Sequence, residues 1–249
     1  MEDITLWNGD CLKLMKDIPD CSIDMIFCDL PYGTTRCKWD VIIPFEQLWK
    51  NYNRIIKPKG AVVLFSCEPF ASKLRLSNIG NYRYDWVWDK VKGTGFLNAK
   101  KQPMRNHELI CVFYKEQCTY NPQKTYGHKA KKSYRSSDMQ TEVYGKMKNN
   151  YSYFSTERYP RSIQEFSTDT QNSSLHPTQK PLALCEYMIK TYTNENNVVL
   201  DNCMGSGTIG VACKKLGRKF IGIELEYKYF EIAKRRIENT QVAIPVELF

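Results

Sequence analysis

The segment Asp29-Leu30-Pro31-Tyr32 combines residue types that could do chemistry, and it follows an apolar run from Ser22 to Cys28. Because proline stiffens the turn after that run, a carboxylate and an aromatic ring are presented together. The carboxylate and a backbone carbonyl could accept hydrogen bonds from the NH₂ group of a planar amine, while the tyrosine ring stacks on it. Taken alone, these four residues favour a simpler interpretation, in which the aspartate caps a turn beneath the tyrosine.

A glycine turn, Gly205-Ser206-Gly207, is the second segment whose residues could form a functional site, and a helical pattern follows it. Glycine lets a ligand approach the main chain, and the first turn of a helix offers N–H groups without partners. Glu224 ends the next predicted strand, where the acid of a nucleotide site accepts hydrogen bonds from ribose hydroxyls. The pattern therefore predicts a cofactor site, and Gly210 completes the G-x-G-x-x-G spacing, which leaves a dinucleotide open.

These segments need a sheet to position them, and the apolar pattern of the chain predicts one. Continuous apolar runs that are typical of buried strands cover residues 22–28, 61–65, 197–200 and 219–223, and helical patterns cover residues 45–56, 181–192, 209–216 and 227–239. Two further strands are predicted at residues 82–88 and 109–114, with a long loop at residues 90–106 between them. The alternation predicts an α/β fold with a mostly parallel sheet, in which both candidate segments lie at the carboxyl ends of strands.

The character of the chain changes between Cys118 and Ser174, where apolar periodicity fades. This segment holds seven of the sixteen tyrosines and a net charge of +4, from nine basic and five acidic residues. Tyrosine among Lys and Arg is typical of a surface that stacks bases and contacts phosphates, although the same composition fits a flexible insertion without a partner. The basic residues are Lys124, Lys129, Lys131, Lys132, Arg135, Lys146, Lys148, Arg158 and Arg161.

The overall composition excludes several classes of protein. With 42% hydrophobic and 25% charged residues, the 249-residue chain is neither disordered throughout, nor collagen-like, nor a coiled coil. Its net charge of +9 fits a polyanionic partner, although such a surplus alone more often serves solubility. Its ten cysteines include no CxxC pair and its three histidines are scattered, so no metal site is predicted. The chain begins without a signal pattern and has no apolar run of about 18 residues, so we expect a cytoplasmic protein with reduced thiols and no membrane partner.

The order of the motifs resembles that of the β group of amino-methylating DNA methyltransferases, which methylate adenine N6 or cytosine N4 with S-adenosylmethionine. In that group a catalytic tetrapeptide like Asp29 to Tyr32 comes first, a target-recognition region follows, and a cofactor loop like Asp201 to Thr208 comes last. Five motifs in this order favour S-adenosylmethionine over a dinucleotide. The three further motifs that are similar to family patterns are Gly9-Asp10-Cys11-Leu12, His107-Glu108 and His176-Pro177-Thr178-Gln179-Lys180-Pro181.

The resemblance implies a Rossmann-like methyltransferase fold with a circularly permuted motif order. Residues 1–117 would form the catalytic half, residues 118–174 the target-recognition region with the nine basic residues as DNA contacts, and residues 175–249 the cofactor-binding half. The family pattern implies that the catalytic residues are Asp29, Leu30, Pro31 and Tyr32. The cofactor-binding residues that it implies are Asp10, Thr178, Lys180, Asp201, Cys203, Gly205, Ser206, Gly207 and Glu224.

Two positions depart from the family pattern. Leu30 stands where a proline is usual, at a position that the family uses through its backbone carbonyl, so the swap should be tolerated. Asn202-Cys203 stands where Pro-Phe is usual, which removes an aromatic ring from the cofactor loop and leaves its glycines intact.

The implied function is site-specific transfer of a methyl group to the N6 of adenine in double-stranded DNA, after the base is flipped out of the duplex. Aspartate rather than serine at position 29 favours adenine, with N4-cytosine methylation or amino methylation of RNA as an alternative. A second alternative is an inactive DNA-binding protein on the same fold, which the intact Asp29, Tyr32 and glycine turn disfavour. The sequence leaves open a homodimer, a partnered restriction nuclease, and whether the 90–106 loop borders the DNA or covers the cofactor.

Overall fold

The computed structural model describes residues 3–35, 37, 40–135, 140–142, 145–146, 151–168 and 179–241. The chain forms two compact units, one of residues Met1–Asn121 with Ser162–Phe249 and one of residues Pro122–Arg161. None of the helices in the described ranges is long and apolar enough to cross a membrane.

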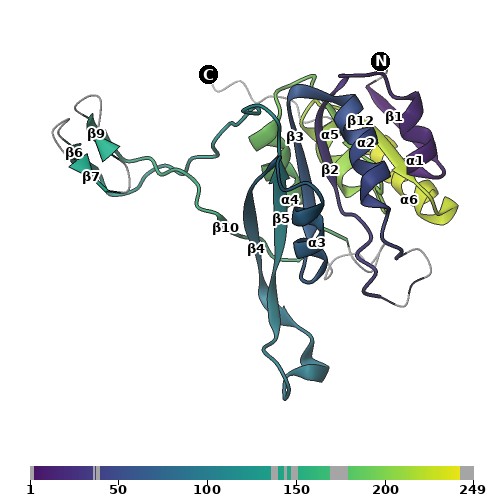
Figure 1. Ribbon diagram of the computed structural model, residues 1–249, viewed down its shortest axis with the longest axis horizontal. Coiled ribbons are helices and arrows are strands. Elements are labelled where there is room, and N and C mark those ends of the chain that lie inside the picture. The colour runs from purple at the N-terminus through teal and green to yellow at the C-terminus, as the bar shows by residue number, and fades with distance from the viewer. Residues whose placement is uncertain are drawn as a thin grey trace. The chain divides into compact units, whose positions relative to one another are not determined.

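An eight-stranded sheet organises the described part of the first unit, in the order β1-β12-β11-β2-β3-β5-β4-β10. In these ranges, neighbouring strands are parallel except where β5 pairs with β3 and β4. The mostly parallel α/β sheet predicted from the sequence is therefore confirmed (Figure 1). The strands are β1 (Ile4–Asn8), β2 (Ile23–Cys28), β3 (Ile56–Ser66), β4 (Tyr82–Thr94), β5 (Arg105–Phe113), β10 (Ile163–Glu165), β11 (Val198–Asp201) and β12 (Lys219–Glu224).

Helices cover both faces of this sheet. Along β2, Met25 and Phe27 pack in the core that contains buried residues of α4, α5 and α6, whereas Ile26 and Cys28 pack in the core of α1, α2 and α3. Because both faces are buried, such strands read as continuous apolar runs rather than as alternating ones. The helices are α1 (Cys11–Leu14) with the 3-10 turn η1 (Met15–Asp17), α2 (Phe45–Ile55), α3 (Phe70–Ser77), α4 (Leu182–Tyr192), α5 (Thr208–Lys215) and α6 (Tyr227–Glu238).

The loop predicted at residues 90–106 is shorter in the structure, because its two ends belong to the strands of a β-hairpin. β4 continues to Thr94, β5 begins at Arg105, and the 3-10 turn η2 (Phe96–Asn98) lies between them. The pairing moves from Asp89 with His107 to Thr94 with Arg105, so residues 90–93 form a bulge on β4. Every residue from 91 to 107 is exposed, so these extensions of the two predicted strands lack the apolar alternation from which strands are predicted.

The second unit has strands of its own. β6 (Lys131–Arg135) pairs antiparallel with β9 (Tyr151–Ser155), and β7 (Gln140–Thr141) pairs with β8 (Gly145–Lys146). Lys132 pairs with Phe154 in this register, and the exposed Tyr134 lies two residues along from Lys132. Since side chains alternate between the faces of a strand, these three side chains share one face of the hairpin.

This second unit is shorter than the segment 118–174 that the sequence sets apart. Cys118 is buried in the core of the first unit, and Phe166 packs against the same core. β10 adds an edge strand to the main sheet beside β4. The compact second unit is therefore Pro122–Arg161, whereas residues up to Asn121 and from Ser162 onward belong to the first unit.

Candidate active site

Four neighbouring strands of the sheet each deliver an acidic residue to the same edge. In sheet order these are Asp10 after β1, Glu224 at the end of β12, Asp201 at the end of β11 and Asp29 after β2. The four strands are parallel, so their carboxyl ends lie together, where open α/β sheets bind their ligands. The edge is therefore rich in hydrogen-bond acceptors and in negative charge.

Both carboxylate oxygens of Asp29 have partners. The hydroxyl of Tyr32 donates to Oδ1 at 2.7 Å, and the ammonium of Lys180 donates to Oδ2 at 2.5 Å. The ring of Tyr32 packs against that of Phe70, with 5.0 Å between their centroids. Burial, together with the nearby Asp29 carboxylate, raises the pKa of Tyr32 well above its usual value. The side chain of Asp29 is still 24% exposed, so a ligand can reach it.

Lys180 links Asp29 to a second carboxylate. Its side chain is 9% exposed, its Nζ lies 3.5 Å from Oε2 of Glu108, and it lies over the ring of Phe65 at 5.0 Å. Burial alone would lower the pKa of Lys180, but the carboxylates of Asp29 and Glu108 raise it above its usual value. Lys180 is therefore a cation that balances the charge of Asp29, and the cofactor contact that the family pattern implies for it stays a prediction.

Glu108 and Lys90 extend this chain of ion pairs, and neither was among the site residues that the sequence predicted. Glu108, on β5, pairs with Lys90 of β4 as well as with Lys180. Burial alone would raise the pKa of Glu108, but Lys180 and Lys90 lower it below its usual value. The signal that could have found Glu108 is an acid at the head of the apolar run 109–113, because a buried acid needs a cationic partner.

Asp40, which the sequence did not single out either, holds the loop that follows the tetrapeptide. Its carboxylate accepts hydrogen bonds from the backbone N–H groups of Gly33, Thr34 and Thr35 at 2.8, 2.9 and 2.6 Å. Burial alone would raise the pKa of Asp40, but these hydrogen bonds lower it below its usual value. The position of Tyr32 is thus supported from its C-terminal side by a charged acceptor.

The glycine turn is tied to the same edge by Glu224. The carboxylate of Glu224 accepts hydrogen bonds from the N–H groups of Gly205 at 2.8 Å and Glu226 at 2.9 Å. Gly207 has a φ of +78°, and a Cβ atom there would lie 2.8 Å from the Cβ of Ala233 on α6. Glycine is therefore required at this position both by the backbone angle and by the close approach of α6.

Asp201 is 2% exposed and lies at the end of β11, just before the turn. Its carboxylate accepts a hydrogen bond from the N–H of Cys203 at 3.1 Å. Burial, reinforced by the carboxylates of Asp29 and Glu224, raises the pKa of Asp201 to about 7. The next residue, Asn202, accepts a hydrogen bond at 2.5 Å from the buried hydroxyl of Tyr52, so α2 also anchors this segment.

The other residues predicted from the family pattern lie around the same edge or outside the described ranges. Asp10 is exposed, accepts a hydrogen bond from the N–H of Leu12 as the N-cap of α1, and lines a cavity of 600 Å³ beside α1 and α2. Of the rest, Leu30 and Ser206 are buried, Pro31 and Cys203 are half-buried, and Thr178 is not among the described residues.

The basic residues predicted to contact DNA differ in their surroundings within the second unit. Lys124 pairs with Glu157 at 2.8 Å, and Arg158 donates hydrogen bonds to the carbonyls of Ser155 and Glu157. Lys124 and Arg158 thus stabilise the unit itself. Lys129, Lys131, Lys132 and Arg161 are exposed, whereas the side chains of Arg135 and Lys146 and all of Lys148 lie outside the described parts.

The chemistry of this edge fits S-adenosylmethionine better than a dinucleotide. Its carboxylates can accept hydrogen bonds from hydroxyl and amino groups and can balance a positive charge, but they would repel a diphosphate. The N–H of Gly205, which a phosphate would need, already donates to Glu224. Oε1 of Gln179, next to Lys180, is buried without a hydrogen-bond partner among the described residues, so it is a further free acceptor. Within the same ranges, no group of three or more His, Cys, Asp or Glu side chains could hold a metal ion.

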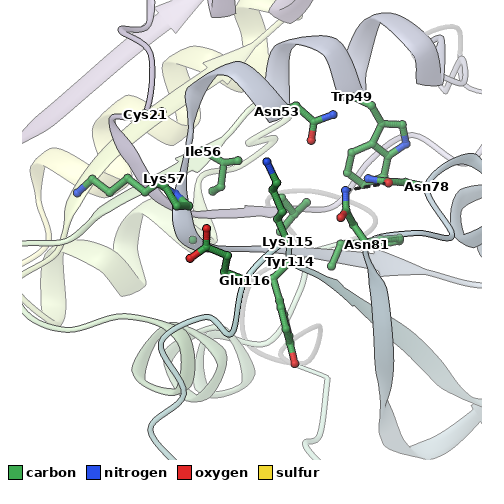
Figure 2. Close-up of a pocket in the computed structure, with 14 residues that line it drawn as sticks. Cys21, Trp49, Asn53, Ile56, Lys57, Asn78, Asn81, Tyr114, Lys115 and Glu116 are labelled. Atoms are coloured by element: carbon green, nitrogen blue, oxygen red, sulfur yellow. Dashed lines mark hydrogen bonds between the residues drawn. The ribbon is translucent and has the colours of Figure 1, made fainter.

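A separate cavity of 460 Å³ lies at the opposite edge of the sheet (Figure 2). It is lined by Ile56 at the start of β3 and by Tyr114, which follows the end of β5, with Trp49, Asn53 and Glu116 around them. Because β3 runs parallel to β2, its start lies at the edge away from the carboxyl end of β2. The cavity of Figure 2 is therefore distinct from the candidate active site.

Comparisons with known proteins agree with this arrangement. The model of a DNA methylase family, N6_N4_Mtase, matches residues 23–235. The chain is 30% identical over 253 residues to the Type II methyltransferase M.HpaI of Haemophilus parainfluenzae, covering 95% of this chain and 75% of that relative. It is 29% identical over 258 residues to the DNA adenine methyltransferase YhdJ of Escherichia coli K12, and this match covers 94% of this chain and 82% of that relative.

The solved structures that resemble this one include the complex of M1.HpyAVI with SAM. The TM-score is 0.64 at 26% identity, and the match covers 94% of this chain and 98% of that one. The predicted Rossmann-like methyltransferase fold and the predicted cofactor, S-adenosylmethionine, are thereby confirmed. By the match of the family model and the identity to M.HpaI, the chain belongs to the N6-adenine and N4-cytosine DNA methylase family.

Proposed function

We propose that the protein transfers a methyl group from S-adenosylmethionine to the exocyclic N6 of adenine at specific sites in double-stranded DNA. The observation that carries this proposal is the partly exposed carboxylate of Asp29, held between Tyr32 and Lys180 at the acidic edge of the sheet. Aspartate at the first place of the tetrapeptide supports adenine over cytosine, and so does the identity to a relative named as a DNA adenine methyltransferase.

The exocyclic amino group of adenine is a poor nucleophile, because its lone pair is delocalised into the ring. Asp29 and the backbone carbonyl of Leu30 would accept the two amino hydrogens, which favours a pyramidal nitrogen and directs its lone pair outward. A carboxylate has about four lone-pair sites, so Asp29 can accept such a bond while Lys180 remains in place. Lys180 and Tyr32 thus hold Asp29 in one orientation, and orientation is the main contribution a protein can make to this reaction.

S-adenosylmethionine, when bound, supplies an electrophilic methyl group on a sulfonium centre. Glu224 and Asp10 would accept hydrogen bonds from its ribose and adenine groups, and Asp201 would balance its positive charge. As the N–C bond forms, the bond between that methyl carbon and sulfur would break and leave its electron pair on sulfur, so the amino nitrogen would become cationic and would have to lose one proton. Asp29 is the carboxylate already placed against that nitrogen, so we assign it the role of first proton acceptor.

The second unit is proposed as the target-recognition region. Lys132, Tyr134 and Phe154 share one face of the β6–β9 hairpin, and the aromatic pair is 64% and 71% exposed. Exposed aromatic rings beside a lysine suit contacts with bases and phosphates. Lys129, Lys131 and Arg161 add exposed positive charge to this unit, which makes salt-dependent DNA binding the expected behaviour.

The nature of the product tests this proposal. The protein is incubated with S-adenosylmethionine labelled in the methyl group and with unmethylated double-stranded DNA, and the DNA is then digested to nucleosides. The proposal predicts label in N6-methyladenine. Label in N4-methylcytosine would show that the target base is cytosine and not adenine. Binding of S-adenosylmethionine without methyl transfer would identify an inactive member of the family.

A further inference from the structure

The β4–β5 hairpin projects from the edge of the sheet that carries Asp29. β4 pairs antiparallel with β5, and β5 pairs antiparallel with β3, so β4 runs in the same direction as β3 and its parallel neighbour β2. The carboxyl end of β4 therefore leaves the sheet on the side of Asp29. Figure 1 shows β4 and β5 continuing side by side to the short turn that carries η2.

The base of this hairpin is connected to Asp29 by ion pairs. Lys90 on β4 contacts Glu108 on β5, Glu108 lies 3.5 Å from Lys180, and Lys180 contacts Asp29 at 2.5 Å. The hairpin thus leaves the sheet directly beside the catalytic carboxylate. A ligand at the tip of the hairpin therefore lies no farther from a base at Asp29 than the length of the hairpin.

The tip is an ordered turn rather than an irregular loop. The N–H groups of Asn98 and Ala99 donate to the carbonyls of Gly95 and Phe96 at 2.9 and 3.0 Å, and Gly95 takes a φ of +90°. The N–H of Lys101 donates to the carbonyl of Asn98 at 2.8 Å. This turn presents two apolar side chains to solvent, because Phe96 is 78% exposed and Leu97 is 97% exposed.

The charge on the hairpin indicates what those apolar side chains meet. Residues 90–106 include five basic residues and no acidic one. Lys92, Lys100 and Lys101 are exposed, and they flank the two apolar residues in the chain. A polyanion is therefore the partner that this surface fits, and an apolar tip flanked by lysines suits a base stack flanked by phosphates.

We propose that the β4–β5 hairpin is a DNA wedge, in which Phe96 and Leu97 enter the base stack beside the flipped adenine while Lys92, Lys100 and Lys101 contact phosphates. This inference rests on the proposed function, since it concerns the same flipped base. Removing a base from the stack leaves a gap and costs stacking energy, and apolar side chains inserted between bases stabilise such distorted duplexes. The three steps from Glu108 to Arg105 span roughly 10 Å, against a groove depth of about 8 Å, so the turn can reach the bases.

The first test measures methylation on paired and mispaired targets. Sequencing of methylated DNA from an expressing host identifies the recognition site, and duplex oligonucleotides carry that site with the target adenine either paired or mismatched. The double variant Phe96→Ala/Leu97→Ala should methylate the paired duplex at least tenfold more slowly than the unmodified protein. On the mismatched duplex the deficit should shrink to about threefold or less, because less unpairing is needed.

A matched control is Leu76→Ala, since Leu76 is 73% exposed on α3 and should leave both rates unchanged. Unchanged turnover of the hairpin variant on the paired duplex would overturn the wedge. An equal deficit on both duplexes, with intact binding of S-adenosylmethionine, would overturn it too, because it would show a role unrelated to unpairing.

The second test needs no methyl transfer, so it separates the wedge from the proposed function. Binding to a paired duplex is measured between 50 and 200 mM salt for Lys100→Gln/Lys101→Gln and for Lys234→Gln, an exposed lysine of α6. The slope of log affinity against log salt is negative, and each lost phosphate contact makes it less steep by about 0.9. The slope of the hairpin variant should therefore be less steep by about 1.8. The control variant should keep its slope, and an unchanged slope in the hairpin variant would contradict the proposed contacts.

Discussion

The Nζ atom of Lys180 lies 2.5 Å from Oδ2 of Asp29, although 151 positions separate the two residues in the chain. Asp29 follows β2, and Lys180 stands just before the N-cap of α4. The contact therefore ties a segment near the cofactor loop in sequence to the tetrapeptide at the other end of the chain. Through Glu108 and Lys90 the same ion pairs reach the base of the β4–β5 hairpin.

Replacement of Lys180 by methionine should destabilise the protein in a pH-dependent way. Lys180→Met keeps the apolar stem but leaves Asp29 and Glu108 without their shared cation, and breaking a buried ion pair lowers the free energy of unfolding by about 3 kcal/mol. Lys180 and Lys90 lower the pKa of Glu108, so the stabilisation is present above the usual carboxyl pKa and is lost as the pH falls through the lowered one. Urea unfolding should therefore show that the variant has a lower free energy of unfolding than the unmodified protein at neutral pH, and that this difference is smaller near pH 3.

The control for this variant is Lys57→Met, which removes a more exposed ion pair with Asp24. Its effect should stay within about 1 kcal/mol. If Lys180→Met is no more destabilising than this control, Lys180 is not the buried counter-ion described above.

The affinity for S-adenosylmethionine should depend on the ionisation of Asp201. Burial raises the pKa of Asp201 to about 7, so the cofactor-free protein loses stability as the pH rises from the usual carboxyl pKa towards 7. A cationic ligand favours the ionised carboxylate, and binding should therefore weaken below pH 7, by up to tenfold for each pH unit. Calorimetric titration from pH 5 to 8 should show this change, with proton release on binding, and Asp201→Asn should abolish it. A flat profile in the unmodified protein would remove Asp201 from the binding site.

The close packing of the glycine turn on α6 can be tested with two alanine substitutions. Both Gly207 and Gly217 have positive φ, at +78° and +66°, but a Cβ at Gly207 would meet Ala233 at 2.8 Å, whereas one at Gly217 would meet nothing within 4 Å. Gly217→Ala should therefore cost about 1 kcal/mol of unfolding free energy, for the backbone alone. Gly207→Ala should cost about 3 kcal/mol, because overpacking adds to it, and should also weaken binding of S-adenosylmethionine. Equal losses in the two variants would show that α6 does not restrict the turn.

The positions of the two main motifs at the ends of strands could be predicted, because each motif directly follows its strand in the chain. Asp29 follows an apolar run, and the glycine turn follows another, so periodicity and the carboxyl-edge rule together predict where both lie. The contacts around Asp29 were not predictable in the same way. Lys90, Glu108 and Lys180 come from three separate segments, and an ion pair between distant segments leaves no local pattern.

The hairpin shows a second limit of sequence reasoning. Residues 91–94 of β4 and 105–107 of β5 are exposed on both faces of their strands, so no apolar alternation distinguishes them from a loop. Glycines at positions 93 and 95 and the lysines around them further suggest a loop. Pairing of β4 with β5 overrides these local preferences, as it does for any strand whose partner is already part of a sheet.

We propose that Asp29 activates the amino group and does not bind the cofactor. Asp29→Ala is compared with Asp20→Ala, a surface carboxylate whose side chain is 74% exposed, in two measurements on each variant. These are the dissociation constant for S-adenosylmethionine and the rate of N6-methyladenine formation in double-stranded DNA. Asp29→Ala should bind the cofactor within about threefold of the unmodified protein but should lose at least 10³-fold in rate, which removal of a positioning and proton-accepting group can produce. Methyl transfer by Asp29→Ala at a rate within tenfold of the Asp20→Ala control would contradict it.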